Sequence, residues 1–138
     1  MNPNLTPITA IAYIEASKIT DYKPNTDGTV AVRTFEPLKR VNFAFGSQSF
    51  LITSKIGVPG VMTTTNMSCT LKEPIVADLN GYFIFFLHVC DGTIRVVGSP
   101  YLPVALQRTH SDQHRALSIE YDSNRDPLIL TNTDIFPQ

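Results

Sequence analysis

Apolar residues dominate one stretch near the middle of the chain, residues 82–90 (YFIFFLHVC). A β-branched run, residues 93–98, follows it across Asp91-Gly92. Asp-Gly between two such runs is typical of a two-residue type I′ β-hairpin, because both central residues of that turn need positive φ. Since the first run has no polar face, we expect a central strand with both faces covered by the rest of the chain.

Alternation of apolar and polar residues, which is typical of half-buried strands, recurs along most of the chain. In the first such segment one face is predicted to carry Ile8, Ala10, Ala12 and Ile14. Further strands are expected at residues 29–35, 40–45, 50–56, 61–71, 115–122 and 128–130. We expect 40–45 to form a hairpin with 50–56, and 61–71 to lie half exposed at a sheet edge.

Other segments are predicted to connect these strands. Residues 16–28 are a polar connection that is dense in turn formers. Pro100 and Pro103 limit residues 101–107 to an edge strand or an extended crossing segment. One helical turn is expected at residues 74–80, because proline suits its first position and Asn-Gly suits a left-handed exit.

These elements predict one mainly β domain over residues 1–138, an antiparallel β-sandwich or barrel of about 8–10 short strands with that short helix. Val, Ile and Thr outnumber Ala, Glu and Lys about two to one, which favours strands. Residues 1–7 are expected to form an arm and 131–138 a loosely attached tail. The predicted core contains Phe43, Phe45, Phe83, Phe85, Phe86, Leu87, Ile94 and Val96.

Charge and composition exclude some classes of partner. The chain carries 11 basic and 12 acidic residues, and its nearest approach to a basic cluster is Lys39-Arg40, so specific nucleic-acid binding is not expected. The start lacks the pattern of a secretory signal, and the longest apolar run is too short for a bilayer, so no membrane is expected as a partner. Cys69 and Cys90 are predicted to be buried free thiols, because a bridge would need an oxidising compartment.

The densest group of chemically versatile side chains is His110-Ser111-Asp112-Gln113-His114. In a helix the two histidines would share a face as in zinc proteases, but the glutamate after the first histidine is missing. In a loop, His110, Asp112 and His114 could converge on a metal; an ordinary solvated loop is the favoured alternative. No nucleophile elbow or nucleotide-binding glycine pattern occurs, so neither a cofactor nor an enzymatic activity is expected.

Two segments carry a resemblance, residues 79–100 (LNGYFIFFLHVCDGTIRVVGSP) and 116–123 (ALSIEYDS). They resemble small structural proteins of the tail or neck of tailed phages and prophages of Bacteroides-type hosts. In those proteins a short helix leads to a strand, an acidic-Gly turn, an Arg-x-x-Gly-[Ser/Thr]-Pro segment and a late closing strand. The resemblance implies a virion component, made in the host cytoplasm, that assembles with copies of itself and other virion proteins without catalysis.

The sequence is therefore compatible with three functions. The first is the virion subunit, in which edge strands rich in Thr and the polar loops 16–28 and 107–114 meet neighbouring subunits in a ring or tube. The second is a soluble β-sandwich module that binds a glycan or a peptide. The third is a hydrolase or metal enzyme centred on His110, Asp112 and His114.

Overall fold

The structure is a computed structural model that describes residues 8–44, 46, 48–57, 60–70, 81–106, 116–123 and 127–137. In this part of the chain it has eleven β-strands and two short 3₁₀ helices, arranged as two packed sheets. The predicted mainly β fold is confirmed. The expected helix at 74–80 and the expected arm at 1–7 lie outside the described residues.

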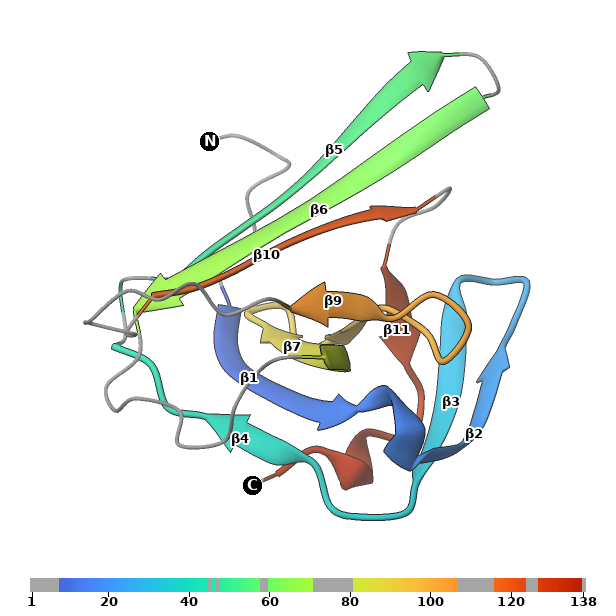
Figure 1. Ribbon diagram of the computed structural model, residues 1–138, viewed down its shortest axis with the longest axis vertical. Helices are drawn as coiled ribbons and strands as arrows, with labels where there is room; N and C mark the ends of the chain where they lie inside the picture. The colour runs from blue at the N-terminus through green and yellow to red at the C-terminus, as the bar shows by residue number, and fades with distance from the viewer. Residues whose placement is uncertain are drawn as a thin grey trace.

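Eight strands form one curled sheet, in the order β2-β3-β11-β8-β7-β1-β4, with β9 paired to the start of β7 (Figure 1). Their bounds are β1 Ile8–Glu15, β2 Ile19–Pro24, β3 Thr29–Thr34, β4 Lys39–Val41, β7 Gly81–Val89, β8 Ile94–Val97, β9 Val104–Leu106 and β11 Leu128–Leu130. The 3₁₀ helices are η1 Ala16–Lys18 and η2 Thr133–Ile135. Because β11 runs parallel to β3, the sheet is mixed rather than wholly antiparallel.

The central position of β7 is confirmed. It pairs with β1 on one side and with β8 and β9 on the other. Every side chain from Phe83 to Leu87 is at most 4% exposed, because alternate residues enter two different hydrophobic cores. Six of the predicted core residues are thereby found buried, including Ile94 and Val96 of β8. Phe43 is partly buried against the first core, and Phe45 lies outside the described residues.

The turn between β7 and β8 differs from the predicted two-residue type I′ turn. The Val89 amide donates to the Thr93 carbonyl at 2.9 Å, and the Gly92 amide donates to the Val89 carbonyl at 3.0 Å. This pattern encloses three residues and ends with Gly92 at φ +91°, as in a type I turn followed by a G1 bulge. Asp91 stabilises it, because its Oδ1 accepts hydrogen bonds from both the amide and the hydroxyl of Thr93.

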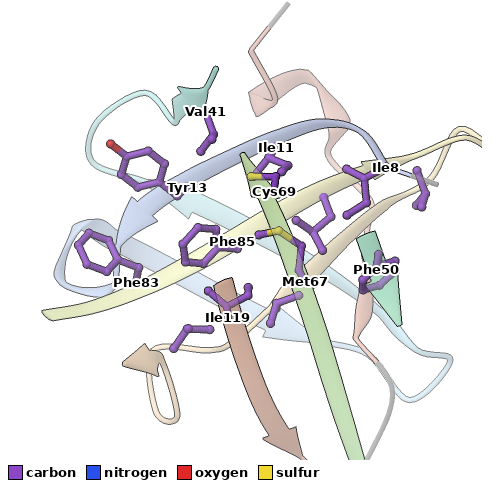
Figure 2. Packing of buried hydrophobic residues seen from close by; sticks show 14 residues of the cluster. Ile8, Ile11, Tyr13, Val41, Phe50, Met67, Cys69, Phe83, Phe85 and Ile119 are labelled. Atoms are coloured by element: carbon purple, nitrogen blue, oxygen red, sulfur yellow. The ribbon is translucent and has the colours of Figure 1, made fainter. Parts of the chain in front are cut away.

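The second sheet has three strands in the order β10-β6-β5, with β5 Ser49–Gly57, β6 Gly60–Thr70 and β10 Ala116–Ser123. Figure 2 shows Met67 and Cys69 of β6 over Phe85 of β7, in the core between the sheets. The predicted hairpin of 40–45 with 50–56 is wrong, since β4 pairs with β1 and β5 with β6. The segment 61–71 is also not at an edge, because β6 lies between β5 and β10.

The opposite face of the large sheet holds a second core, which the C-terminal segment covers. Phe136 is buried in this core. Asn132 accepts a hydrogen bond from the Val32 amide at 3.1 Å and donates one to the Val32 carbonyl at 2.6 Å. Residues 131–137, which were expected to belong to a loosely attached tail, are therefore held against the sheet.

Two further expectations need correction near the start of the chain. Residues 16–28 are not simply a connection, because they contain η1 and β2, and β2 pairs with β3. The register of β1 against β7 also shifts between Ile8 and Ala10, so one extra residue is accommodated there. Ile8 consequently joins the first core with Ile11, whereas Ala10 faces the second core.

Candidate functional site

A pocket of about 430 Å³ lies beside the second core, where strands of the large sheet meet the C-terminal segment. Its described lining consists of Thr9, Ala10, Arg40, His88, Gly92, Ile94, Thr133, Phe136 and Pro137. The size lies within the usual range for small-ligand sites. The lining is mixed, with an apolar wall and four side chains that can donate hydrogen bonds, namely those of Thr9, Arg40, His88 and Thr133.

Strand register brings the polar lining residues together. Ala10 is paired with His88 of β7, and Ala12 is paired with Arg40 of β4. Residues paired across neighbouring strands have side chains on one face, so His88 and Arg40 share the face of the second core. Thr9 is the residue inserted at the register shift in β1, and bulges of this kind commonly redirect a side chain beside a site.

The imidazole of His88 is held by two neighbours. Its Nδ1 lies 2.6 Å from the hydroxyl oxygen of Thr9, and that hydroxyl donates to the His88 carbonyl oxygen at 3.1 Å. The hydroxyl has one proton, so when it donates to the carbonyl oxygen the Nδ1–H group donates to the hydroxyl, and Nε2 is the other polar atom of the ring. The ring centroid lies 5.8 Å from that of Phe136, so the C-terminal segment packs on it.

The pocket has a positively charged rim. The side chain of Arg40 is exposed and has no hydrogen bond or ion pair with any residue in the described part of the chain. The two ion pairs found in that part lie elsewhere, between Lys18 and Glu36 and between Lys23 and Asp21. No carboxylate belongs to the described lining, so the pocket is suited to an anion.

The outer edge of β5 is a second candidate surface. Natural proteins protect sheet edges with short strands, charges, prolines or bulges. The β2 edge has Pro24 and a register shift, and β4 is only three residues long. In contrast, β5 has nine residues in unbroken register with β6, contains no proline and has Lys55 as its one charged residue.

Figure 1 shows how this edge is presented. The hairpin of β5 and β6 extends away from the large sheet, and β10 covers the other side of β6. No strand of the described residues pairs with the outer edge of β5. The backbone amides and carbonyls along it can therefore accept another strand.

The metal candidates His110, Asp112 and His114 all lie outside the described residues. Within the described ranges, no group of His, Cys, Asp and Glu side chains could hold a metal ion. Arg40 was noticed in the sequence only as half of a basic pair. Arg40 and His88 line one pocket only because β4 and β7 both pair with β1, and no short stretch of sequence signals that pairing.

The two cysteines are both free, but they differ in environment. Cys69 is buried in the first core, and burial raises the pKa of its thiol to about 11. Cys90 is exposed in the turn after β7, so the expectation that it would be buried is wrong.

Comparison with known protein families, with curated proteins and with solved structures gives no match to this chain. Among the residues that the structure describes, none belongs to a helix with the length and apolar character needed to cross a bilayer. The features that bear on function are therefore the pocket, the β5 edge and the resemblance carried by residues 79–100 and 116–123.

Proposed function

We propose that this chain is a non-enzymatic structural subunit that joins its neighbours by strand addition at the outer edge of β5. The nine-residue length of this edge, its lack of proline and the absence of any described strand paired with it carry the proposal. A strand of nine residues spans about 30 Å, which is long enough for a substantial ladder of intermolecular hydrogen bonds. A neighbouring strand placed there would extend the three-stranded sheet without disturbing either hydrophobic core.

The resemblance to tail and neck proteins of tailed phages supplies the biological setting of this proposal. Its larger segment, residues 79–100, contains β7 and β8, which lie at the centre of the fold. In this proposal the central hairpin holds the scaffold, and the β5 edge contacts other copies of the chain or other virion proteins. The subunit would act in virion assembly and would carry out no reaction.

The test uses two lysine substitutions on the same face of the small sheet. Thr53 lies on β5, and Asn66 lies on the central strand β6. Thr53→Lys adds a charge to the edge, which is a common protection against strand addition. Asn66→Lys is the matched control, because it adds the same charge to a strand that already has partners on both sides.

The mass of each purified protein is measured by size exclusion with light scattering over a concentration series, with electron microscopy of the same samples. We expect the parent chain and Asn66→Lys to form oligomers and Thr53→Lys to remain monomeric. A parent chain that is monomeric at every concentration and joins no particle would contradict the proposal. Equal disruption by both substitutions would place the contact on the sheet face and would contradict strand addition.

A peptide-binding module is the second candidate, because the same β5 edge would accept an extended peptide. The two functions predict different masses for the protein in solution: an oligomer for the virion subunit and a monomer for the peptide-binding module. A chain that stays monomeric but captures extended peptides, with Thr53→Lys abolishing capture, would favour the module over the virion subunit.

A further inference from the structure

We infer that the pocket around Arg40 and His88 binds a small carboxylate that carries an apolar group. This inference is independent of the β5 edge, because the pocket lies on the large sheet beside the second core. It assigns a ligand class to a part of the molecule that the proposed assembly does not use.

The carboxylate is placed by Arg40. A guanidinium presents a planar fork of N–H donors that matches a carboxylate in bidentate geometry, and such charge-assisted hydrogen bonds are among the stronger ones. Arg40 forms no ion pair within the described chain, so its donors are available to a ligand. Because Arg40 is paired with Ala12 and His88 with Ala10, Arg40 and His88 lie on the same face of the large sheet.

A second polar group, the imidazole of His88, is already oriented before a ligand arrives. Thr9 holds Nδ1 of His88, and Phe136 packs against the ring. The imidazole therefore loses little conformational freedom when it contacts a ligand, which favours binding.

The apolar part of the ligand is expected to lie against Ile94 and Phe136. Both side chains line the pocket, and their total exposed fractions are 3% and 7%. A compact branched or aromatic group suits this wall. Inorganic phosphate has no apolar group for this wall, and the described lining has a single guanidinium to balance its higher negative charge.

The experiment titrates the full chain with 4-methylpentanoate and, separately, with 4-methylpentanamide and inorganic phosphate. Amide chemical shifts of Gly92 and Ile94 report binding, at concentrations up to about 10 mM. Arg40→Gln removes the charge. Arg33→Gln is the matched control, because Arg33 is an exposed residue of β3 that is not among the pocket's lining residues. The melting temperature of each variant confirms that it folds. If Arg40→Gln fails to fold, Arg40→Lys replaces it, because lysine keeps the positive charge but cannot form the bidentate hydrogen bonds of a guanidinium.

We expect saturable binding of 4-methylpentanoate, with the amide and phosphate each at least about tenfold weaker. Arg40→Gln should weaken carboxylate binding about tenfold or more, Arg40→Lys should weaken it less, and Arg33→Gln should leave it within about twofold. Equal affinity for carboxylate and amide, equal affinity for phosphate, equal effects of Arg40→Gln and Arg33→Gln, or no binding in this concentration range would each overturn the inference.

Discussion

One inserted residue in β1 decides which side chains enter which core. A strict period of two would place Ile8 on the same face as Ala10. The register shift at Thr9 moves Ile8 to the face of Ile11, where it is fully buried between the two sheets. The same shift leaves the Thr9 hydroxyl beside His88, so the bulge serves both the packing and the pocket.

The two thiols should react at very different rates in the folded protein. At about pH 8, Cys90 is expected to react quickly with a disulfide reagent, because its thiol is exposed. Cys69 should react only after unfolding, because burial blocks access and raises its pKa to about 11, so that it stays a protonated thiol. Counting released thiolate with and without denaturant measures this difference.

Cys90→Ser is the control for this prediction and should abolish the fast reaction. Cys69→Ser should preserve the fast reaction and remove the part that depends on denaturant. Fast modification of both thiols in the native protein would contradict the burial of Cys69.

At the scale of elements, two hairpins use the same turn chemistry. Asp27-Gly28-Thr29 joins β2 to β3, and Asp91-Gly92-Thr93 joins β7 to β8. In each turn the aspartate accepts hydrogen bonds from the amide and hydroxyl of the threonine two residues later, which lowers the pKa of the carboxyl. Each glycine has positive φ, +89° and +91°. The repeated Asp-Gly-Thr is therefore a local sequence signal for this three-residue turn.

Two glycines with similar φ should differ in their tolerance of alanine. Gly92, at φ +91°, has nothing within 4 Å of an added Cβ, so Gly92→Ala should cost about 1–2 kcal/mol from backbone strain alone. At Gly98, φ +98°, an added Cβ would lie 3.2 Å from Val104 Cγ2 and 3.4 Å from the Phe83 carbonyl oxygen. Gly98→Ala should cost about 1–3 kcal/mol more, because β9 must also move.

Urea denaturation of the two alanine variants measures both free energies of unfolding. Since Gly28 also has open space around its Cβ position, Gly28→Ala serves as a second case of strain alone. Equal losses for Gly92→Ala and Gly98→Ala would show that the approach of β9 does not constrain position 98.

At the scale of the whole molecule, the large sheet is covered on both faces in different ways. The three-stranded sheet covers one face, and the C-terminal segment covers part of the other. That segment is anchored by Asn132, whose side chain pairs with both backbone polar groups of Val32. The end of the chain therefore closes the second core and supplies Phe136 and Pro137 to the pocket.

Asn132→Ala should lower the free energy of unfolding by about 1–3 kcal/mol, because it leaves the amide and carbonyl of Val32 without their partners in a partly buried position. Chemical denaturation measures this loss. Asp134→Ala is the control in the same segment, and its exposed position predicts a change within about 0.5 kcal/mol. An Asn132→Ala variant as stable as the control would show that the C-terminal segment is not anchored there.

The sequence alone determined the mainly β class, the position of most strands and the buried hairpin around Phe83 and Phe85. These features follow from local patterns, namely apolar runs, alternation and turn residues, which act over a few neighbouring positions. Local patterns also placed the β10 and β11 strands within one or two residues of where they lie.

Tertiary structure alone decided which strands pair, and hence where the candidate sites are. The alternating pattern of 40–45 would suit many partners, and only competition among all strands put β4 beside β1 and β5 beside β6. Arg40 and His88 are 48 residues apart in the chain and share a pocket through the intervening strand β1. Such long-range pairing depends on packing summed over the whole molecule, so no short stretch of sequence contains it.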